Sequence, residues 1–517
     1  MFLCAYMVKK FSNSSCLGFT QLLYFYRPAN FFINMEEIVS AVSGLFVSFK
    51  SAEADRIEKL PQSGSDRIYF RLYAGSETYI ATFNINTKEN STFIYFSKHF
   101  ANARLPIPEI FAVNEEKTIY IQQDLGTESL LDALERSGQN DYSYHLYQQT
   151  LQELAKVQIL GDKGLDYDQC LTAKEFGRQA IISDLLYFKY YFLDILKTPY
   201  DKQAMLNDFE AISNYLSNSA YKYFLFRDFQ SRNVIVDNDK VHFIDYQGGM
   251  KGALQYDVAS LLWQAKANLS EEWKDNLLQY YMCEAEKLLG EKMDKDVFIR
   301  QYNGYVLIRL LQVLGAYGFR GLFERKAHFL TSIPLALKNL RFFIENKQTG
   351  VKTPEFDRML KHVISDDIIA KFETVKADEN TSLVVKICSF SYKKEKPEDE
   401  TGNGGGFVFD MRGILNPGRF SEYKYLTGRD KEVKDFLEQQ TKITDFLNSV
   451  FHVVDISAED YIRRGFSSLM VSFGCTGGQH RSVYAADALA RHLKNKFNVK
   501  IQLHHLVQDK INWKPRP

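Results

Sequence analysis

One stretch near the middle of the chain, residues 223–249, constrains the fold most; it reads YFLFRDFQSRNVIVDNDKVHFIDYQGG. Two apolar runs flank the turn-forming residues 237–239, a pattern that predicts a β-hairpin. Asp228 and Asn233 stand five positions apart before the hairpin, and Asp245 ends its second strand. Because residues 237–239 already supply the turn, we interpret these three polar residues as functional.

Their chemistry matches phosphoryl transfer. That reaction needs a carboxylate to accept the proton of the attacking hydroxyl, and oxygen ligands to hold Mg²⁺ on the nucleotide phosphates. We therefore predict Asp228 as the base and Asn233 and Asp245 as the metal ligands. The alternative is that these residues are turn formers, a common role for Asp and Asn.

This stretch resembles the aminoglycoside-phosphotransferase-like kinases, and the resemblance continues through GALQYDVASLLWQAKANL, where Asp257 is similar to the family's structural aspartate. It resembles most the branch that phosphorylates the anomeric hydroxyl of N-acetylmuramate and N-acetylglucosamine. The resemblance implies an α+β two-lobed fold, with a small lobe over 35–124, a helical lobe over 125–346, and ATP with Mg²⁺ between them. It further implies a phosphate loop at Gly64, Ser65 and Asp66 and an adenine hinge at Gln123 and Asp124.

Two departures from the kinase pattern stand out. Where many kinases carry a strand lysine, this chain has Thr82, Phe83 and Asn84; the amino-sugar branch also lacks that lysine. Phe226 and Arg227 precede the base, where related kinases usually place a histidine, and we count Arg227 with Asp228 as catalytic because it is expected to support the loop. A regulatory protein with a degenerate kinase domain is the alternative.

A second motif, GCTGGQHRS at residues 474–482, lies between an apolar run and a helical pattern. Its glycines let backbone N–H groups point inward beside a helix N-terminus, which predicts a cradle for a phosphate. Cys475 and Arg481 also have the Cys-x5-Arg spacing of cysteine-dependent phosphatases, so a nucleophilic thiolate is an alternative. A plain strand-to-helix turn is the simplest alternative.

Four motifs in order, SLVVKICSF, FVFDMRGILNPG, YLTGRD and GCTGGQHRSVYAADALARHL, resemble the C-terminal domain of the RapZ (YvcJ) family. The resemblance implies a smaller α/β domain over 381–517 that binds a phosphate or phosphorylated amino sugar and small RNA. The family's usual nucleotide-binding loop, G-x-x-x-x-G-K-[ST], is absent here. The implied pocket residues are Asp410, Arg412, Asn416, Thr427, Gly428, Asp430, Cys475, Thr476, Gly477, Gly478, His480 and Arg481.

RNA binding also rests on charge, which is local rather than global. Lys+Arg and Asp+Glu are equal at 64 each, but the tail is basic and includes Lys510, Lys514 and Arg516, which we predict to contact RNA. A solvated helix face would have the same composition.

The remaining chain sets the domain boundaries. The 517 residues, 45% of them hydrophobic, suffice for more than one core. Residues 1–34 read as a non-structural extension before Met35, with a membrane-surface anchor as the alternative, and no run reaches the ~18 apolar residues of a transmembrane segment. Short strands around one helix near 92–104 are expected over 62–124, mostly helices over 129–346, and a connecting helix and linker over 347–380. Six scattered cysteines indicate a reducing, cytoplasmic location.

The sequence thus predicts a bifunctional protein, an ATP-dependent amino-sugar kinase fused to a phosphosugar-sensing module that could bind RNA. It leaves the oligomeric state open.

Overall fold

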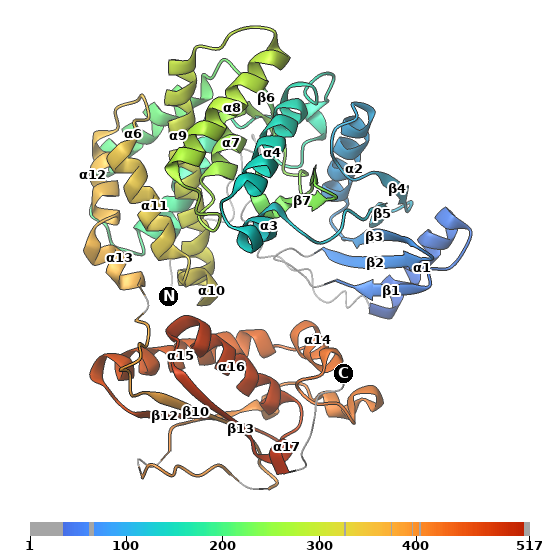
Figure 1. Cartoon of the computed structure of the whole chain (residues 1–517), viewed down its shortest axis with the longest axis vertical. Coiled ribbons are helices and arrows are strands. Elements are labelled where there is room, and N and C mark those ends of the chain that lie inside the picture. Colours follow the sequence, from blue (N-terminus) through green and yellow to red (C-terminus); the bar gives the residue numbers. More distant parts are fainter. Residues whose placement is uncertain are drawn as a thin grey trace, which may run out of the picture. The chain divides into compact units, whose positions relative to one another are not determined.

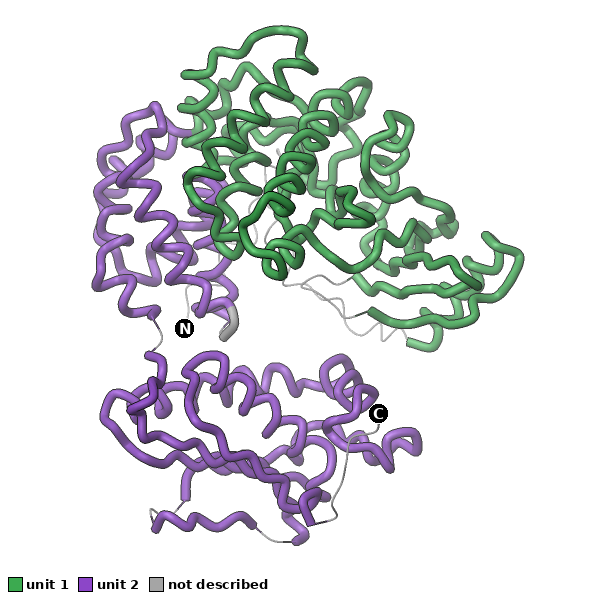
Figure 2. The backbone as a smooth tube through the Cα atoms, in the orientation of Figure 1, with its two compact units in different colours: residues 1–181, 213–306 green, residues 182–212, 307–517 purple. Residues whose placement is uncertain are grey.

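The computed structural model describes residues 35–60, 67–324, 327–373, 375–394, 396–402 and 405–510. The extension 1–34, the predicted phosphate loop Gly64-Ser65-Asp66, and Lys514 and Arg516 lie outside these ranges. The chain divides into two compact units, Met1–Ile181 with Ser213–Val306, and Ile182–Ile212 with Leu307–Pro517 (Figure 2). Three helices contain residues of both units: α5 (Arg178–Phe188), α6 (Lys202–Ser217) and α9 (Lys295–Tyr317).

The first unit begins with a five-stranded antiparallel sheet in the order β1-β2-β3-β5-β4 (Figure 1). Alternation explains the strands, since Phe70 and Leu72 of β2 are buried between more exposed neighbours. α1 buries Ile38, Val42 and Phe46 at four-residue spacing in the same core. The elements are α1 (Met35–Lys50), β1 (Arg56–Lys59), β2 (Ile68–Ala74), β3 (Glu77–Phe83), α2 (Thr87–Asn102), β4 (Ile110–Val113) and β5 (Ile119–Gln123).

The rest of this unit is mainly helical and carries the predicted hairpin. β7 (Val234–Asp237) pairs with β8 (Lys240–Phe243), and Asn238 and Asp239 of the two-residue turn have φ of 48° and 60°. Two successive left-handed residues are typical of the turns that match strand twist, and Asn and Asp tolerate them. The other elements are α3 (Leu130–Ser137), α4 (Asp141–Ile159), η2 (Tyr167–Gln169), β6 (Lys222–Leu225), η4 (Ser231–Asn233), β9 (Met250–Ala253), α7 (Leu254–Leu262) and α8 (Glu271–Leu289).

The second unit contains a group of helices followed by an α/β domain. Residues 347–380, expected as a connecting helix and linker, contain two of these helices, α12 (Pro354–Val363) and α13 (Asp366–Phe372). The helical group comprises η3 (Lys189–Leu193), η5 (Gly318–Phe323), α10 (Ala327–Leu330), α11 (Ile333–Asn346), α12 (Pro354–Val363) and α13 (Asp366–Phe372).

The α/β domain is built on a four-stranded parallel sheet in the order β11-β12-β10-β13 (Figure 1). α16 packs against β10, β12 and β13, and its Ala485, Leu489 and Leu493 share one core with β10 and β12. The elements are β10 (Val384–Ser391), β11 (Phe407–Asp410), η6 (Met411–Gly413), η7 (Pro417–Arg419), η8 (Ser421–Tyr423), α14 (Lys431–Gln440), α15 (Ile443–Arg464), β12 (Ser468–Cys475), α16 (Arg481–Phe497), β13 (Lys500–His505) and α17 (Leu506–Lys510).

Among the described residues, one helical stretch, Lys295–Phe323, is long and apolar enough to cross a bilayer. In its most apolar window, 56% is buried inside the fold, and a buried core helix of a globular domain has the same length and composition.

Candidate functional site

The chain before the predicted base is anchored by Asp257, which is fully buried in α7. One oxygen of its carboxylate accepts hydrogen bonds from the backbone N–H of Phe226 (2.7 Å) and from Gln158 Nε2 (3.0 Å). The other oxygen accepts one from the backbone N–H of Arg227 (3.0 Å). Charge-assisted hydrogen bonds of this kind are the strong ones, so Asp257 fixes the backbone that leads to Asp228.

Arg227 itself has an unusual backbone, with φ of 78°. A non-glycine residue in this region is strained, and such strain concentrates at functional sites. Its guanidinium lies 4.5 Å from the centre of the Phe176 ring and donates a hydrogen bond to the Tyr256 hydroxyl (2.5 Å). These contacts belong to a residue that supports the loop.

Asp228 follows at the surface, with 38% of its side chain exposed. Its carboxylate accepts a hydrogen bond from Gln230 Nε2 (2.5 Å) and lies 3.4 Å from the guanidinium of Arg232. A carboxylate that is oriented by its neighbours and open to solvent can accept a proton from a bound hydroxyl.

Asn233 and Asp245 are brought together on either side of the hairpin. The Asn233 amide donates to the carbonyl oxygen of Asp228 (2.9 Å), and the Asn233 carbonyl accepts a hydrogen bond from the backbone N–H of Ile244 (3.1 Å). Asp245 has φ of 68°, and its Oδ1 accepts from Arg67 Nη2 and Gln247 Nε2, both at 2.9 Å. Asn233 Oδ1 and Asp245 Oδ2 are therefore the atoms that could bind a cation.

This donor set suits Mg²⁺, which is usually held by one or two protein oxygens together with substrate phosphates and water. In the part of the chain that the structure describes, no group of three or more His, Cys, Asp or Glu residues could hold a metal alone. Mg²⁺ at Asn233 and Asp245 would thus depend on a bound nucleotide.

The predicted hinge lies where β5 ends. Arg71 of β2 binds the Asp124 carboxylate with two nitrogens, at 2.6 and 3.0 Å, and the backbone N–H of Gly126 donates to the same group (3.0 Å). Gln123 pairs through its backbone with Glu109. The Asp124 side chain thus fixes the strand end, and its backbone is the part that an adenine could contact.

In the α/β domain, the predicted pocket residues come from three loops at the carboxyl ends of β11 and β12 and before α14. Arg481, at the start of α16, connects two of them. Its Nη1 donates to the carbonyl oxygens of Ile414 (2.7 Å) and Arg412 (3.3 Å), and its Nη2 to Thr476 Oγ1 (3.4 Å). Asp410 is held by Arg412 (2.7 Å), and the Asn416 side chain accepts from the Gly418 N–H (3.4 Å).

The third loop closes on the same helix end. The Gly428 N–H donates to the carbonyl oxygen of Gln479 (3.0 Å), and a Cβ at Gly428 would lie 2.2 Å from the carbonyl oxygen of His480. His480 Nε2 donates to the carbonyl oxygen of Tyr423 (2.9 Å), and burial lowers the pKa of its ring. Gly428 is therefore required for this close approach.

Cys475 is buried at the end of β12. Its sulfur accepts from the backbone N–H of Gly478 (3.1 Å), where φ is 66°, and lies 3.1 Å from Ser482 Oγ. A Cβ at Gly477 would meet no atom within 4 Å, so this face of the loop is open.

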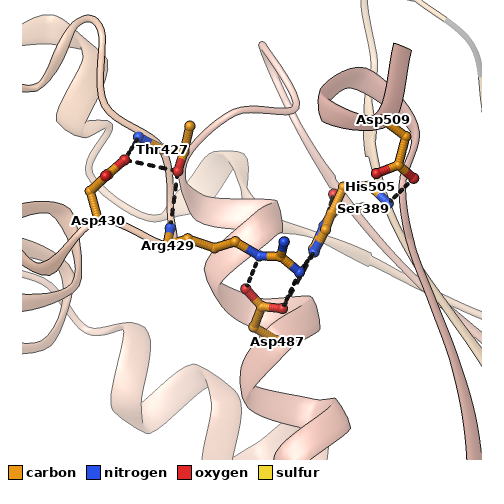
Figure 3. A network of polar contacts seen from close by, with 7 residues as sticks. All are labelled: Ser389, Thr427, Arg429, Asp430, Asp487, His505 and Asp509. Carbon is orange, nitrogen blue, oxygen red and sulfur yellow. Dashed lines mark hydrogen bonds and ion pairs between the residues drawn. The ribbon is translucent and has the colours of Figure 1, made fainter. Parts of the chain in front are cut away.

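Sequence reasoning missed a partly buried polar network beside this site (Figure 3). Arg429 binds Asp487 through two nitrogens, at 2.9 and 3.0 Å, and lies 2.8 Å from the His505 ring, which in turn lies 2.8 Å from Ser389 Oγ. Burial alone would raise the pKa of Asp487, but His505 and Arg429 lower it to about 2. The sequence feature that points to this network is the position of Arg429 between two predicted pocket residues, Gly428 and Asp430.

Thr427 and Asp430 belong to the same network. The Asp430 carboxylate accepts from the N–H and hydroxyl of Thr427, at 2.6 and 2.9 Å, and thereby fixes the turn before α14.

A separate groove of about 500 Å³ lies near the other end of β12, lined by Phe407, Tyr461 and Phe466 among others, and none of the predicted pocket residues lines it.

Comparison with known proteins matches two separate parts of the chain. Residues 56–289 match the model of the phosphotransferase enzyme family, and residues 383–508 match that of the RapZ C-terminal domain. The chain thus combines a segment similar to the phosphotransferase family with one similar to the RapZ C-terminal domain. The predicted fold class, a two-lobed phosphotransferase domain followed by a smaller α/β domain, is confirmed.

The individual relatives match parts of the chain. A nucleotide-binding protein of Fervidobacterium nodosum is 36% identical over 124 residues, which are 24% of this chain and 42% of that protein. A nucleotide-binding protein of Endomicrobium trichonymphae is 38% identical over 123 residues, which are 24% of this chain and 41% of that protein. The chain thus spans less than half the length of these curated relatives.

Solved structures of kinases are also similar to this chain. A choline kinase of Cryptosporidium parvum (TM-score 0.44, 13% identity) covers 60% of this chain and 97% of its own. The match to a choline/ethanolamine kinase family protein of Mesorhizobium loti (TM-score 0.42, 13% identity) covers 63% of this chain and 99% of that protein.

Proposed function

We propose that the phosphotransferase domain transfers the γ-phosphoryl group of ATP to a hydroxyl of an amino sugar. One observation carries this proposal: the exposed carboxylate of Asp228 stands on a loop held by the buried Asp257, and Asn233 joins that loop to the residues beside Asp245. Base and metal ligands are thus fixed relative to one another, which phosphoryl transfer requires.

In the proposed step, Asp228 accepts the proton of the sugar hydroxyl while the oxygen of that hydroxyl forms a bond to the γ-phosphorus. The bond between this phosphorus and the β,γ-bridging oxygen breaks, and ADP leaves with that electron pair. Mg²⁺ bound with the nucleotide would offset the phosphate charge, and Asn233 and Asp245 are the residues that would hold it.

The acceptor we propose is the anomeric hydroxyl of N-acetylmuramate or N-acetylglucosamine, as in cell-wall recycling, because the motifs around Asp228 and Asp257 resemble that branch. The competing proposal is a regulatory protein whose kinase domain binds nucleotide without turnover. It predicts Mg²⁺-dependent nucleotide binding and no sugar-dependent ADP release.

The test is ADP release from ATP and Mg²⁺ with a panel of amino sugars, followed by NMR of the product. An anomeric phosphate and a 6-phosphate give different phosphorus–proton couplings. Asp228→Asn should lower turnover by at least about a hundredfold, the usual contribution of a general base. Asp239→Asn, in the hairpin turn of the same stretch, is the matched control and should keep it. The kinase proposal fails if no sugar stimulates turnover or if Asp228→Asn retains it.

We propose further that the RapZ C-terminal domain binds the phosphate of a phosphorylated amino sugar. The observation that carries this is Arg481, which is 3% exposed and whose hydrogen-bond acceptors are all uncharged. Its Nε, also buried, finds no hydrogen-bond partner among the described residues, and burial lowers the pKa of its guanidinium. An anion at the N-terminus of α16 would compensate this charge.

Titration of the full-length protein with inorganic phosphate and with N-acetylglucosamine 1- and 6-phosphates tests this site. Arg481→Met should abolish binding, whereas Cys475→Ser should preserve it because the hydroxyl can still accept from Gly478. Phosphate release that is lost in Cys475→Ser would instead support the phosphatase alternative.

RNA binding is a further proposal, supported by the basic composition of the tail and less by the described contacts. Arg463 pairs with Glu459 (2.6 Å), Arg464 with Asp460 (3.1 Å) and Lys496 with Asp455 (2.7 Å), so part of the local excess of charge is neutralised. A filter-binding assay at several salt concentrations tests it, since phosphate contacts weaken steeply with salt.

A further inference from the structure

The phosphotransferase domain has no lysine on β3, which reads ETYIATF. In protein kinases, a strand lysine forms an ion pair with a helix glutamate, and this pair must be in place together with the metal-binding aspartate. If this domain is a kinase, some other group has to supply the cation between these carboxylates.

Arg67, directly before β2, has this geometry. A single nitrogen, Nη2, lies 3.1 Å from Glu89 Oε1 in the first turn of α2 and 2.9 Å from Asp245 Oδ1. Its Nη1 donates to the Tyr69 hydroxyl (3.0 Å). One guanidinium therefore joins the strand, the helix and the predicted metal ligand.

The surroundings make this bridge more than a surface ion pair. The Arg67 side chain is only 10% exposed, and its two partners are 20% and 33% exposed. Burial alone would lower the pKa of Arg67, but Tyr69, Asp245, Tyr120 and Glu89 raise it above its usual value. The arginine stays charged while it faces two carboxylates, and it can therefore hold both of them in place.

Glu89 is itself fixed from the strand side. Its second oxygen, Oε2, accepts a hydrogen bond from Asn84 Nδ2 (3.0 Å), and Asn84 follows the last residue of β3. Asn86 caps α2 by accepting from the Glu89 N–H (3.2 Å). The contact from strand to helix is thus made by an amide, and the positive charge comes from Arg67.

On the metal side, Arg67 and Gln247 both bind Oδ1 of Asp245. They orient the carboxylate so that Oδ2 is the oxygen available to Mg²⁺. Outer-shell partners of this kind commonly set metal affinity.

We propose that Arg67 is the positioning residue that takes the place of the strand lysine, holding Glu89 and Asp245 so that Asp245 can bind the Mg²⁺ of the nucleotide. This inference rests on the proposed kinase function and predicts an effect on metal dependence that a purely structural ion pair would not produce.

The experiment titrates full-length protein with a fluorescent, non-hydrolysable ATP analogue at a series of Mg²⁺ concentrations. Arg67→Met should raise the Mg²⁺ concentration for half-maximal binding by about 10- to 100-fold, the usual effect of losing an outer-shell partner. Binding of the analogue without metal should change less than about twofold, because Arg67 acts through Asp245. The Mg²⁺ concentration for half-maximal binding to Arg67→Lys should lie between the values of the wild type and of Arg67→Met, because an ammonium group is a point charge and cannot form the same fork.

Arg56→Met is the matched control, because Arg56 is an exposed arginine of β1 that pairs with Glu58 (3.3 Å). It should leave the Mg²⁺ dependence unchanged. Thermal unfolding without nucleotide shows whether each variant is folded, and Arg67→Lys provides the comparison if Arg67→Met is not.

The two proposals can fail separately. Wild-type turnover combined with a wild-type Mg²⁺ dependence in Arg67→Met would overturn the role of Arg67 and leave the kinase intact. Mg²⁺-dependent binding that is sensitive to Arg67, in a protein without turnover on any sugar, would support the role of Arg67 and refute the kinase. A wild-type protein that binds no nucleotide with Mg²⁺ would overturn both.

Discussion

Asp257→Asn should destabilise the phosphotransferase domain more than any exposed substitution in it. The carboxylate accepts three hydrogen bonds, two on one oxygen and one on the other, in a fully buried position. An asparagine keeps the shape but can accept on one atom only, and its NH₂ then faces at least one backbone donor. We expect the loss of one hydrogen bond to a charged group, about 1.5–3 kcal/mol, and weakening of the others by about 1 kcal/mol each.

The sum is about 3.5–5 kcal/mol, which corresponds to a decrease of roughly 7–20 °C in the unfolding midpoint of a domain of this size. Scanning calorimetry of the full chain measures it, using the transition that shifts when Mg²⁺ and a non-hydrolysable ATP analogue are added. Asp275→Asn, an exposed substitution on α8, is the control and should stay within about 0.5 kcal/mol. A loss below about 1 kcal/mol for Asp257→Asn would refute the claim that this carboxylate anchors the catalytic loop.

Three further predictions concern other contacts. The folded pKa of Asp487, about 2, lies below the unfolded value of about 3.9, so its contacts with His505 and Arg429 together contribute stability above pH 5, about 2–3 kcal/mol, that is lost as the pH falls towards 2. Urea unfolding between pH 7 and 3 should show this slope, and Arg429→Met should reduce it. Gly428→Ala should cost about 1–3 kcal/mol and weaken phosphate binding because its Cβ would collide with the backbone of His480 and Tyr484, whereas Gly413→Ala, with open space around it, should do neither. Arg71→Met should cost about 3 kcal/mol by leaving the buried Asp124 carboxylate unpaired, measured by thermal unfolding, and an unchanged midpoint would contradict the ion pair seen here.

The hairpin and its polar residues could be predicted because their signals are local. Residues 237–239 are typical turn formers, and the hairpin that they predict is present. In the folded chain, the Asn233 amide donates a hydrogen bond to the carbonyl oxygen of Asp228. Boundaries differ from those expected: the helix predicted near 92–104 begins at Thr87, five residues before the predicted start, because Asn86 caps it there. β1, β4 and β9 were not predicted, because strands of four residues carry no periodic signal of their own; β7 and β8 are equally short and could be predicted because of the turn residues between them.

The contacts that join distant segments could not be read from the sequence. Arg67 lies 178 positions from Asp245, and nothing in the spacing links the two. The network of Arg429, Asp487 and His505 is equally non-local, because parallel strands bring together loops that the chain separates by a whole helix. The predicted pocket residues emerged from family motifs, which carry such tertiary information indirectly.

The left-handed backbone of Arg227 has a consequence for substitution series at this position. Elsewhere in a folded chain, glycine usually ranks below alanine because it has more freedom to lose on folding. At position 227 the order should reverse: both variants give up the stacking on Phe176, but Arg227→Gly also relieves the contact between Cβ and the backbone, which Arg227→Ala keeps. A variant with glycine that folds better than the variant with alanine would reveal the loop's geometry from stability data alone.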